Sequence, residues 1–199
     1  MAAERLFAER RLVAVSHGRP DEATAQGAIG SAGYHFGTKA DLVRAIVRSH
    51  GERIDRIRVR ILAETGDSAD LHDWVSCLVR PVTEHLAVLG SPSWYARFSA
   101  QVMTDPALRD IAEFAPSPAL KQILDGLRRC RTGLPAEVHA ERAAMARQLI
   151  VHVCAEREGV LALNTMRPRP CWRDTATSLT DAIVGLWLAP VTNRSGGTA

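Results

Sequence analysis

Three side chains that can bind phosphate lie close together near the N-terminus of this chain. Tyr34 and His35 place a phenol beside an imidazole, and both groups can form hydrogen bonds with phosphate oxygens. Lys39 follows in the first turn of a predicted helix, where its cation stands beside backbone N–H groups without helical partners. These residues predict positioning contacts with a phosphodiester backbone. The alternative is an exposed histidine, a half-buried packing tyrosine and a solvated lysine.

The helix that positions Lys39 is the best defined in the sequence. The Thr38 hydroxyl can accept a hydrogen bond from the backbone N–H of Asp41, whose carboxylate can reach back, as in a capping box. Six residues then recur every three or four positions, over about 26 residues or roughly 39 Å. They are Leu42, Ile46, His50, Ile54, Ile57 and Ile61. A helix of this length can connect two bodies.

The rest of the chain also has helical periodicity. No stretch alternates apolar and polar residues between paired turns, so the sequence predicts an all-α fold. Gly and Pro breaks separate the helices at residues 37, 65–68, 90–93, 116–118, 133–135 and 164–170. We expect helices at 68–89, with a kink at Pro81, and at 93–104, 106–114, 117–131, 137–157 and 174–188.

The last two helices predict a homodimer. In the final helix, large or small apolar residues repeat every three or four positions, which is typical of a seam that packs on another helix at a shallow angle. With Leu149 of the preceding helix, we expect the seam to form half of a four-helix interface between two copies. The seam could equally pack within its own chain. The predicted interface residues are Leu149, Trp172, Leu179, Ile183 and Leu186.

The N-terminal region resembles the TetR family of bacterial transcriptional regulators. The resemblance covers about 47 residues and rests on the pattern of Ala3, Leu6, Phe7 and Ala8, on Ala14-Val15-Ser16, and on Tyr34-His35-Phe36-Gly37-Thr38-Lys39 followed by Asp41-Leu42. It implies a three-helix helix-turn-helix DNA-binding domain in residues 1–47. A larger helical ligand-binding and dimerisation domain would occupy residues 48–190, with a disordered tail at 191–199.

The resemblance also implies a function and its sites. The chain would be a repressor that binds double-stranded operator DNA as a homodimer and is released by a small, mostly apolar effector. The helix around residues 30–34 would enter the major groove, and the DNA-binding residues would be Gln26, Ser31, Tyr34, His35 and Lys39. The effector would contact Trp94, Tyr95, Phe98 and Met103, although aromatic and Met residues at helical spacing are also typical of a core.

Two departures from the family pattern support a second hypothesis. Gly18 and Pro20 interrupt the second helix, which we expect to begin only at Pro20 and to be about two turns long. Residues 26–33 contain no Arg, Lys or Asn, the side chains that usually read base edges. The alternative function is therefore a dimeric helical ligand sensor whose DNA binding is impaired or lost.

Catalytic and metal-binding patterns do not appear in the sequence. We find no H-E-x-x-H, G-x-S-x-G, glycine-rich phosphate loop or paired-carboxylate motif, so we expect neither an enzyme nor a cofactor. His139 and Glu141, like His152 and Cys154, are two residues apart and point away from each other on a helix, so we expect no metal site. Four scattered cysteines are interpreted as small buried hydrophobic residues.

Composition indicates a globular protein with a basic N-terminal region. Of 199 residues, 46% are hydrophobic and 24% charged, values that exclude a disordered or disulfide-stapled chain. Residues 1–60 contain eleven Lys or Arg and seven Asp or Glu, a positive excess that suits a polyanion. Dense charge in residues 1–12 predicts no signal peptide, and no apolar run approaches the roughly 20 residues of a membrane span. We therefore expect a cytoplasmic protein without a membrane partner.

Overall fold

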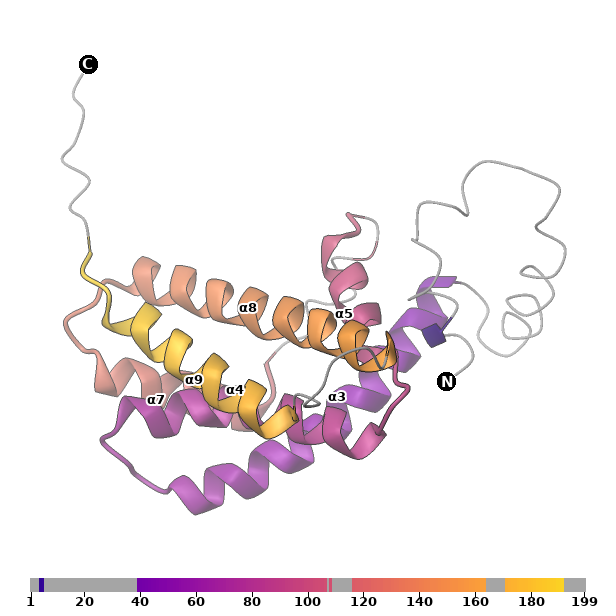
Figure 1. Cartoon of the computed structure of the whole chain (residues 1–199). Coiled ribbons are helices and arrows are strands. Elements are labelled where there is room, and N and C mark those ends of the chain that lie inside the picture. The colour runs from indigo at the N-terminus through magenta and orange to yellow at the C-terminus, as the bar shows by residue number, and fades with distance from the viewer. Residues whose placement is uncertain (1–3, 6–38, 107, 109–115, 164–170, 192–199) are drawn as a thin grey trace, which may run out of the picture.

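The computed structural model describes residues 4–5, 39–106, 108, 116–163 and 171–191 (Figure 1). Helix is the only regular secondary structure in these residues, which confirms the all-α prediction for the described part of the chain. Most of the predicted helix-turn-helix domain, and the tail beyond Val191, lie outside it. The described residues form six helices of ten or more residues: α3 (Lys39–Thr65), α4 (Leu71–Leu89), α5 (Tyr95–Thr104), α7 (Pro118–Cys130), α8 (Ala136–Leu163) and α9 (Trp172–Leu188).

Helix α3 follows the predicted stripe. All six stripe residues are buried or half-buried: Leu42, Ile46, His50, Ile54, Ile57 and Ile61. The helix ends at Gly66, whose positive φ of 58° lets its N–H bond the Leu62 carbonyl at 3.2 Å, because glycine enters this conformation without a Cβ penalty. Figure 1 shows α3 running alongside α4. The domain boundary predicted between residues 47 and 48 falls inside this continuous helix.

The described helices α3–α5 and α7–α9 form a helical body. Helix α4 lies at its centre and contacts α3, α7, α8 and α9. It begins after Asp70, whose carboxylate accepts a hydrogen bond from the backbone N–H of His72 at 2.9 Å. Pro81 lies inside the helix, which continues to Leu89. Because α4 has neighbours on several sides, residues around much of its circumference are buried: Leu71, Trp74, Val75, Cys77, Val79, Pro81, Thr83, His85 and Leu86.

Ser117 is the N-cap residue of α7 and also connects this helix to α3. The Ser117 hydroxyl accepts a hydrogen bond from the backbone N–H of Leu120 at 3.2 Å, and Pro118 occupies the first turn, where its missing N–H costs no helical hydrogen bond. The same hydroxyl donates to the Asp55 carboxylate of α3 at 2.6 Å. One side chain therefore begins a helix and fixes its position in the fold.

The last two helices pack on each other and cover the rest of the core. A buried arginine of α8, Arg142, donates hydrogen bonds to the carbonyl oxygens of Trp187 and Ala189, each at 2.6 Å. These carbonyls belong to the end of α9, where helical partners are missing and a cation is favourable. Arg142 thus satisfies the C-terminus of α9 and joins it to α8.

Close packing between α4 and α7 predicts the effect of a small substitution. A Cβ atom at Gly126 would lie 2.3 Å from ring atoms of Trp74, which is 1% exposed and cannot move into solvent. Gly126→Ala should therefore lower the free energy of unfolding by about 1–3 kcal/mol, measured by urea denaturation.

Gly51→Ala is the matched control, because no atom lies within 4 Å of a Cβ built at this position of α3. It should stabilise the protein by about 0.5–1 kcal/mol, since alanine favours a helix interior over glycine. Equal effects of the two substitutions would contradict the tight contact at Trp74.

Candidate functional site

The predicted DNA-binding residues are mostly beyond what the structure describes. Gln26, Ser31, Tyr34 and His35 all lie within residues 6–38, outside the described residues. Lys39 is the first residue of α3, so its backbone lies at the helix N-terminus, where the sequence predicts it. The structure thus describes the helix that leaves the predicted DNA-binding domain and what this helix meets in the body.

A buried polar cluster surrounds His50 of α3. Its Nδ1 lies 2.7 Å from Nε2 of His85 in α4, and its Nε2 lies 3.0 Å from Oε1 of Glu4. All three residues are buried, with 3–8% of their surface exposed. The contacts bring together residues that are 35 and 46 positions from His50 along the chain.

A tyrosine of α5 closes the cluster on another side. The Tyr95 ring stacks on His50 with centroids 3.8 Å apart and an angle of 11° between planes, and it meets the His85 ring edge-on at 5.7 Å. Burial raises the pKa of the Tyr95 hydroxyl, so the phenol stays neutral. The cluster therefore combines aromatic packing with hydrogen bonds in one buried place.

The protonation states follow from these surroundings. Burial, with smaller effects of His50 and Arg53, lowers the pKa of His85 to about 4, so this imidazole is neutral near pH 7. The hydrogen bond with His50 is the largest cause of a lowered pKa at Glu4, which is ionised. Because a carboxylate has no proton to give, His50 Nε2 must donate to Glu4. A single proton then lies between His50 Nδ1 and His85 Nε2.

The N-terminus of α5 is fixed by a buried carboxylate of α8. Glu158 is 2% exposed, and it accepts hydrogen bonds from the Ser93 hydroxyl at 2.7 Å and from the backbone N–H of Ala96 at 3.2 Å. It also accepts from the backbone N–H of Arg97 at 3.0 Å and from the Arg97 guanidinium at 3.2 Å. A negative charge at a helix N-terminus is favourable. Glu158 therefore fixes the segment that carries Trp94 and Tyr95.

The residues predicted to contact an effector have unlike surroundings. Tyr95 and Phe98 are core residues, 8% and 0% exposed, whereas Trp94 and Met103 are half-buried. The Arg5 guanidinium lies over the Trp94 ring, 5.7 Å from its centroid. Packing within the chain accounts for Tyr95 and Phe98 without a ligand, so an effector contact there remains a prediction.

A large groove lies between α4 and α9, and none of those four residues lines it. Its volume of about 1100 Å³ could hold a small molecule. The lining is mixed, with hydroxyl, charged and apolar groups. It consists of His72, Ser76, Arg80, Thr83, Glu84, Ala87, Gly90, Ser91, Leu161, Cys171, Trp172, Arg173, Asp174, Ala176, Thr177 and Thr180.

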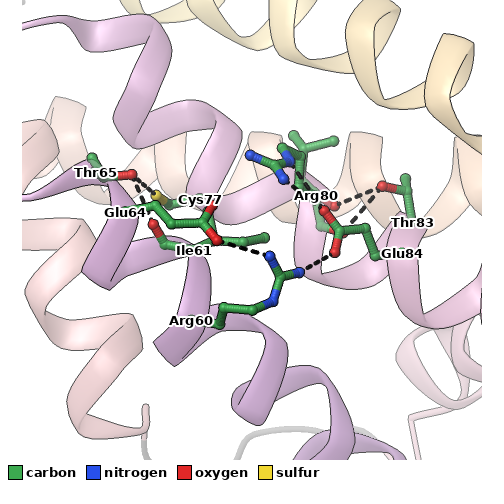
Figure 2. Close-up of polar contacts among 9 residues, drawn as sticks. Arg60, Ile61, Glu64, Thr65, Cys77, Arg80, Thr83 and Glu84 are labelled. Carbon is green, nitrogen blue, oxygen red and sulfur yellow. Dashed lines mark hydrogen bonds and ion pairs between the residues drawn. The ribbon is translucent and has the colours of Figure 1, made fainter.

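One wall of the groove is linked to α3 by charged side chains (Figure 2). Arg80 donates to Glu84 through Nε at 3.1 Å and Nη2 at 2.9 Å, and the other oxygen of Glu84 accepts from Arg60 of α3. Arg60 also donates to Glu64 at 3.0 Å. These groups are partly exposed, so each pair adds little stability, but Glu84 joins the groove to the helix that leaves the predicted DNA-binding domain.

The predicted dimer residues do not share one exposed face. Leu179 and Ile183 are 3% and 0% exposed within the single chain, and α9 packs on α4. Trp172 and Leu186 are half-buried, and Leu149 of α8 is 38% exposed. The apolar character of the seam is therefore explained inside the chain. A charged side chain in place of Leu179 or Ile183 would disrupt folding. Such a variant therefore cannot show whether two copies of the chain associate.

The sequence did not predict Glu4, His85 or Glu158 as site residues, although His50 was expected in the apolar stripe of α3. An imidazole among five aliphatic stripe positions was the available signal, because a buried polar group needs a partner. The partners themselves had no signal, since they are far away along the chain. In the described residues, no group of three or more His, Cys, Asp or Glu is arranged to hold a metal ion.

Comparisons with family models and with curated proteins do not show a family for this chain. No model of a known protein family matches it. No curated protein matches it either. Among the described residues, no helix combines the length and apolar character needed to cross a membrane.

The buried cluster predicts acid sensitivity. Unfolding restores an ordinary histidine pKa of 6.5 to His85, so the unfolded chain binds more protons between about pH 6.5 and 4. The free energy of unfolding should therefore decrease as the pH is lowered across this window, by at most about 1.4 kcal/mol per pH unit for this proton. Glu4 acts in the same direction at lower pH, because protonation removes the stability gained above its lowered pKa. Urea denaturation over this pH range measures the slope.

His85→Phe should reduce that slope, even though it also leaves a buried His50 nitrogen unpaired and lowers stability at every pH. His152→Gln is the control, because His152 of α8 is exposed and its change should leave the slope as in the wild type. An unchanged slope in His85→Phe would show that His85 does not resist protonation in the folded protein.

Proposed function

We propose that this protein is a TetR-like, DNA-binding transcriptional regulator, a repressor that releases its operator when a small molecule binds the body. The observation that carries the proposal is the continuity of α3 from the end of the predicted DNA-binding region into the core. This helix begins at Lys39, directly after the Tyr34-His35 motif, and continues into the core, where it packs on α4 and α7. A displacement of α4 would therefore move the helix that follows the predicted recognition segment.

Charge and chemistry at the N-terminus support DNA as the partner. The positive excess of residues 1–60 favours a polyanion, and Tyr34, His35 and Lys39 are suited to phosphate oxygens. Such contacts position a protein on a duplex without reading its sequence. In the proposal, Gln26 and Ser31 carry the base readout.

The effector site of the proposed regulator has two candidate positions beside α4. One is the segment containing Trp94, Tyr95, Phe98 and Met103, and the other is the groove between α4 and α9. The groove favours a molecule with polar groups as well as an apolar part, because hydroxyls and charges line it beside Trp172. Binding in the groove would act on α3 through α4, which packs on it. Binding at the segment with Tyr95 would act on α3 directly, because the Tyr95 ring stacks on His50.

A specific observation favours the alternative function, a dimeric helical ligand sensor whose DNA binding is impaired or lost. Pro20 cannot continue a helix from Ser16, and Gly18 weakens one further. A shortened second helix would hold the recognition segment poorly. The body and its groove would serve a sensor as well as a repressor.

Salt dependence of DNA binding tests the repressor. Wild-type protein should bind the duplex flanking its own gene with an affinity that falls steeply as salt rises, because each neutralised phosphate releases condensed counterions. Lys39→Gln should reduce the logarithmic salt slope by about 1 per protomer and weaken binding on all sequences alike. Fluorescence anisotropy over a salt series measures both quantities.

Lys121→Gln is the matched control, since Lys121 is the other lysine of the chain and is exposed on α7, away from α3's first turn. It should leave the slope unchanged. Pro20→Ile with Gly18→Arg restores a continuous helical pattern and should strengthen binding. Absence of binding by both wild type and this variant at low salt would reject the repressor in favour of the sensor.

A homodimer is part of the proposal, and exposed residues of α8 allow a clean test. Met145 and Leu149 lie one turn apart and are 50% and 38% exposed, so a charge there should not disturb the fold. Met145→Glu with Leu149→Glu should convert a dimer to a folded monomer in sedimentation velocity. Val88→Glu is the control, because Val88 is 82% exposed at the end of α4. A double variant that sediments as the wild type would place the interface elsewhere.

A further inference from the structure

The contacts of His50 join three parts of the chain. His50 belongs to α3, His85 to α4 and Glu4 to the N-terminal region that the sequence assigns to DNA binding. Each partner uses a different ring nitrogen of His50. His50 is therefore a hydrogen-bonding bridge between Glu4 and α4, held in place by the stacked Tyr95 ring.

Burial makes the two hydrogen bonds depend on each other. In water, a lost partner is replaced at little cost, but a buried donor or acceptor without a partner is penalised. If His85 moves away, His50 Nδ1 loses the partner that it has in this structure, and the buried ring no longer has both nitrogens paired in its present orientation. The position of α4 and the docking of Glu4 are thus linked through one imidazole.

A second contact places the N-terminal residues at the same corner of the body. The Arg5 guanidinium lies over Trp94, the residue before Tyr95, and Glu158 fixes this segment from α8. Arg5 therefore docks on the segment that Glu158 holds, whereas Glu4 docks on His50, on which Tyr95 of the same segment is stacked. Because this segment is held rigidly, a shift of the segment would move the docked residues with it.

We propose that the chain Glu4–His50–His85 is a latch that fixes the N-terminal region on the body and makes its docking depend on the position of α4. Its role in regulating DNA affinity rests on the proposed function. The residue before His85 is Glu84, which lines the groove and pairs with Arg60 of α3. A molecule in the groove that displaces this part of α4 would separate His85 from His50 and release Glu4.

A double-mutant cycle tests the latch without any use of DNA. Glu4→Ala and His85→Phe each remove one partner of His50, so their effects on the unfolding equilibrium constant should be non-additive by roughly 3-fold or more. In a His50→Phe background, which keeps an aromatic ring against Tyr95 but has no nitrogen, the same pair should be additive within about 2-fold. Coupling that persists in His50→Phe would overturn the latch, because it would not pass through His50.

Nitrogen-15 NMR of histidine-labelled protein provides a measurement that needs no folded His50→Phe variant. In the wild type, a scalar coupling should connect His50 Nδ1 and His85 Nε2 across their hydrogen bond, and it should be lost in His85→Phe. Glu4→Ala should shift the His50 Nε2 resonance, whereas Glu52→Ala, at an exposed position of α3, should leave it in place. No coupling in the wild type would overturn the proposal.

DNA affinity then separates the latch from the proposed function. Glu4→Ala should weaken operator binding by about 5-fold or more, the lower end of measured couplings between sites, and Glu52→Ala should not. Wild-type affinity in Glu4→Ala would overturn the regulatory role of the latch. If the wild type binds no DNA at low salt, the proposed function fails, and the double-mutant cycle alone decides whether the latch exists.

Discussion

Burial of α4 is the constraint on which the rest of the body depends. This helix contacts α3, α7, α8 and α9, and Trp74, Val75, Val79 and Leu86 are each no more than 1% exposed. A helix with apolar residues on several faces cannot lie at a surface, so its neighbours must surround it. The close approach of Gly126 to Trp74 shows how little free space this arrangement leaves between α4 and α7. A movement of α4 is therefore passed to its neighbours, since a packed interior deforms little.

Two buried charged side chains of the body lie at helix termini, where backbone groups have no helical hydrogen-bond partners. Glu158 accepts hydrogen bonds at the N-terminus of α5, and Arg142 donates to the last carbonyls of α9. Each charge has the sign that the helix end favours, and each has several partners, which offsets the cost of removing it from water. His50 has another role, because its partners belong to α4 and to the N-terminal region. The first two residues fix helices within the body, whereas His50 joins the body to what precedes it.

In the proposed function, these features would allow the helical body to regulate DNA binding. Helix α3 is continuous across the predicted domain boundary, so the two parts share a rigid element instead of a flexible linker. The charged side chains of Arg60 and Glu84 connect α3 to the wall of the groove, as Figure 2 shows, and the imidazoles of His50 and His85 form a second contact between α3 and α4. A small molecule beside α4 would thus act on α3 through two routes. The sensor hypothesis uses the same body without the DNA contact.

Local pattern by itself predicted the positions of most of the described helices, although it ended the helix of residues 137–157 six residues before α8 ends at Leu163. The stripe of α3 and the Ser117-Pro118 start of α7 follow from side chains within one or two turns of each other, and a sequence contains that information directly. Tertiary structure decided what each face meets. The seam of α9 is apolar whichever surface covers it, and only packing showed that α4 lies against it and buries Leu179 and Ile183. Likewise, His50 was visible in its stripe, but its partners are 35 and 46 residues away, and periodicity carries no information over such separations.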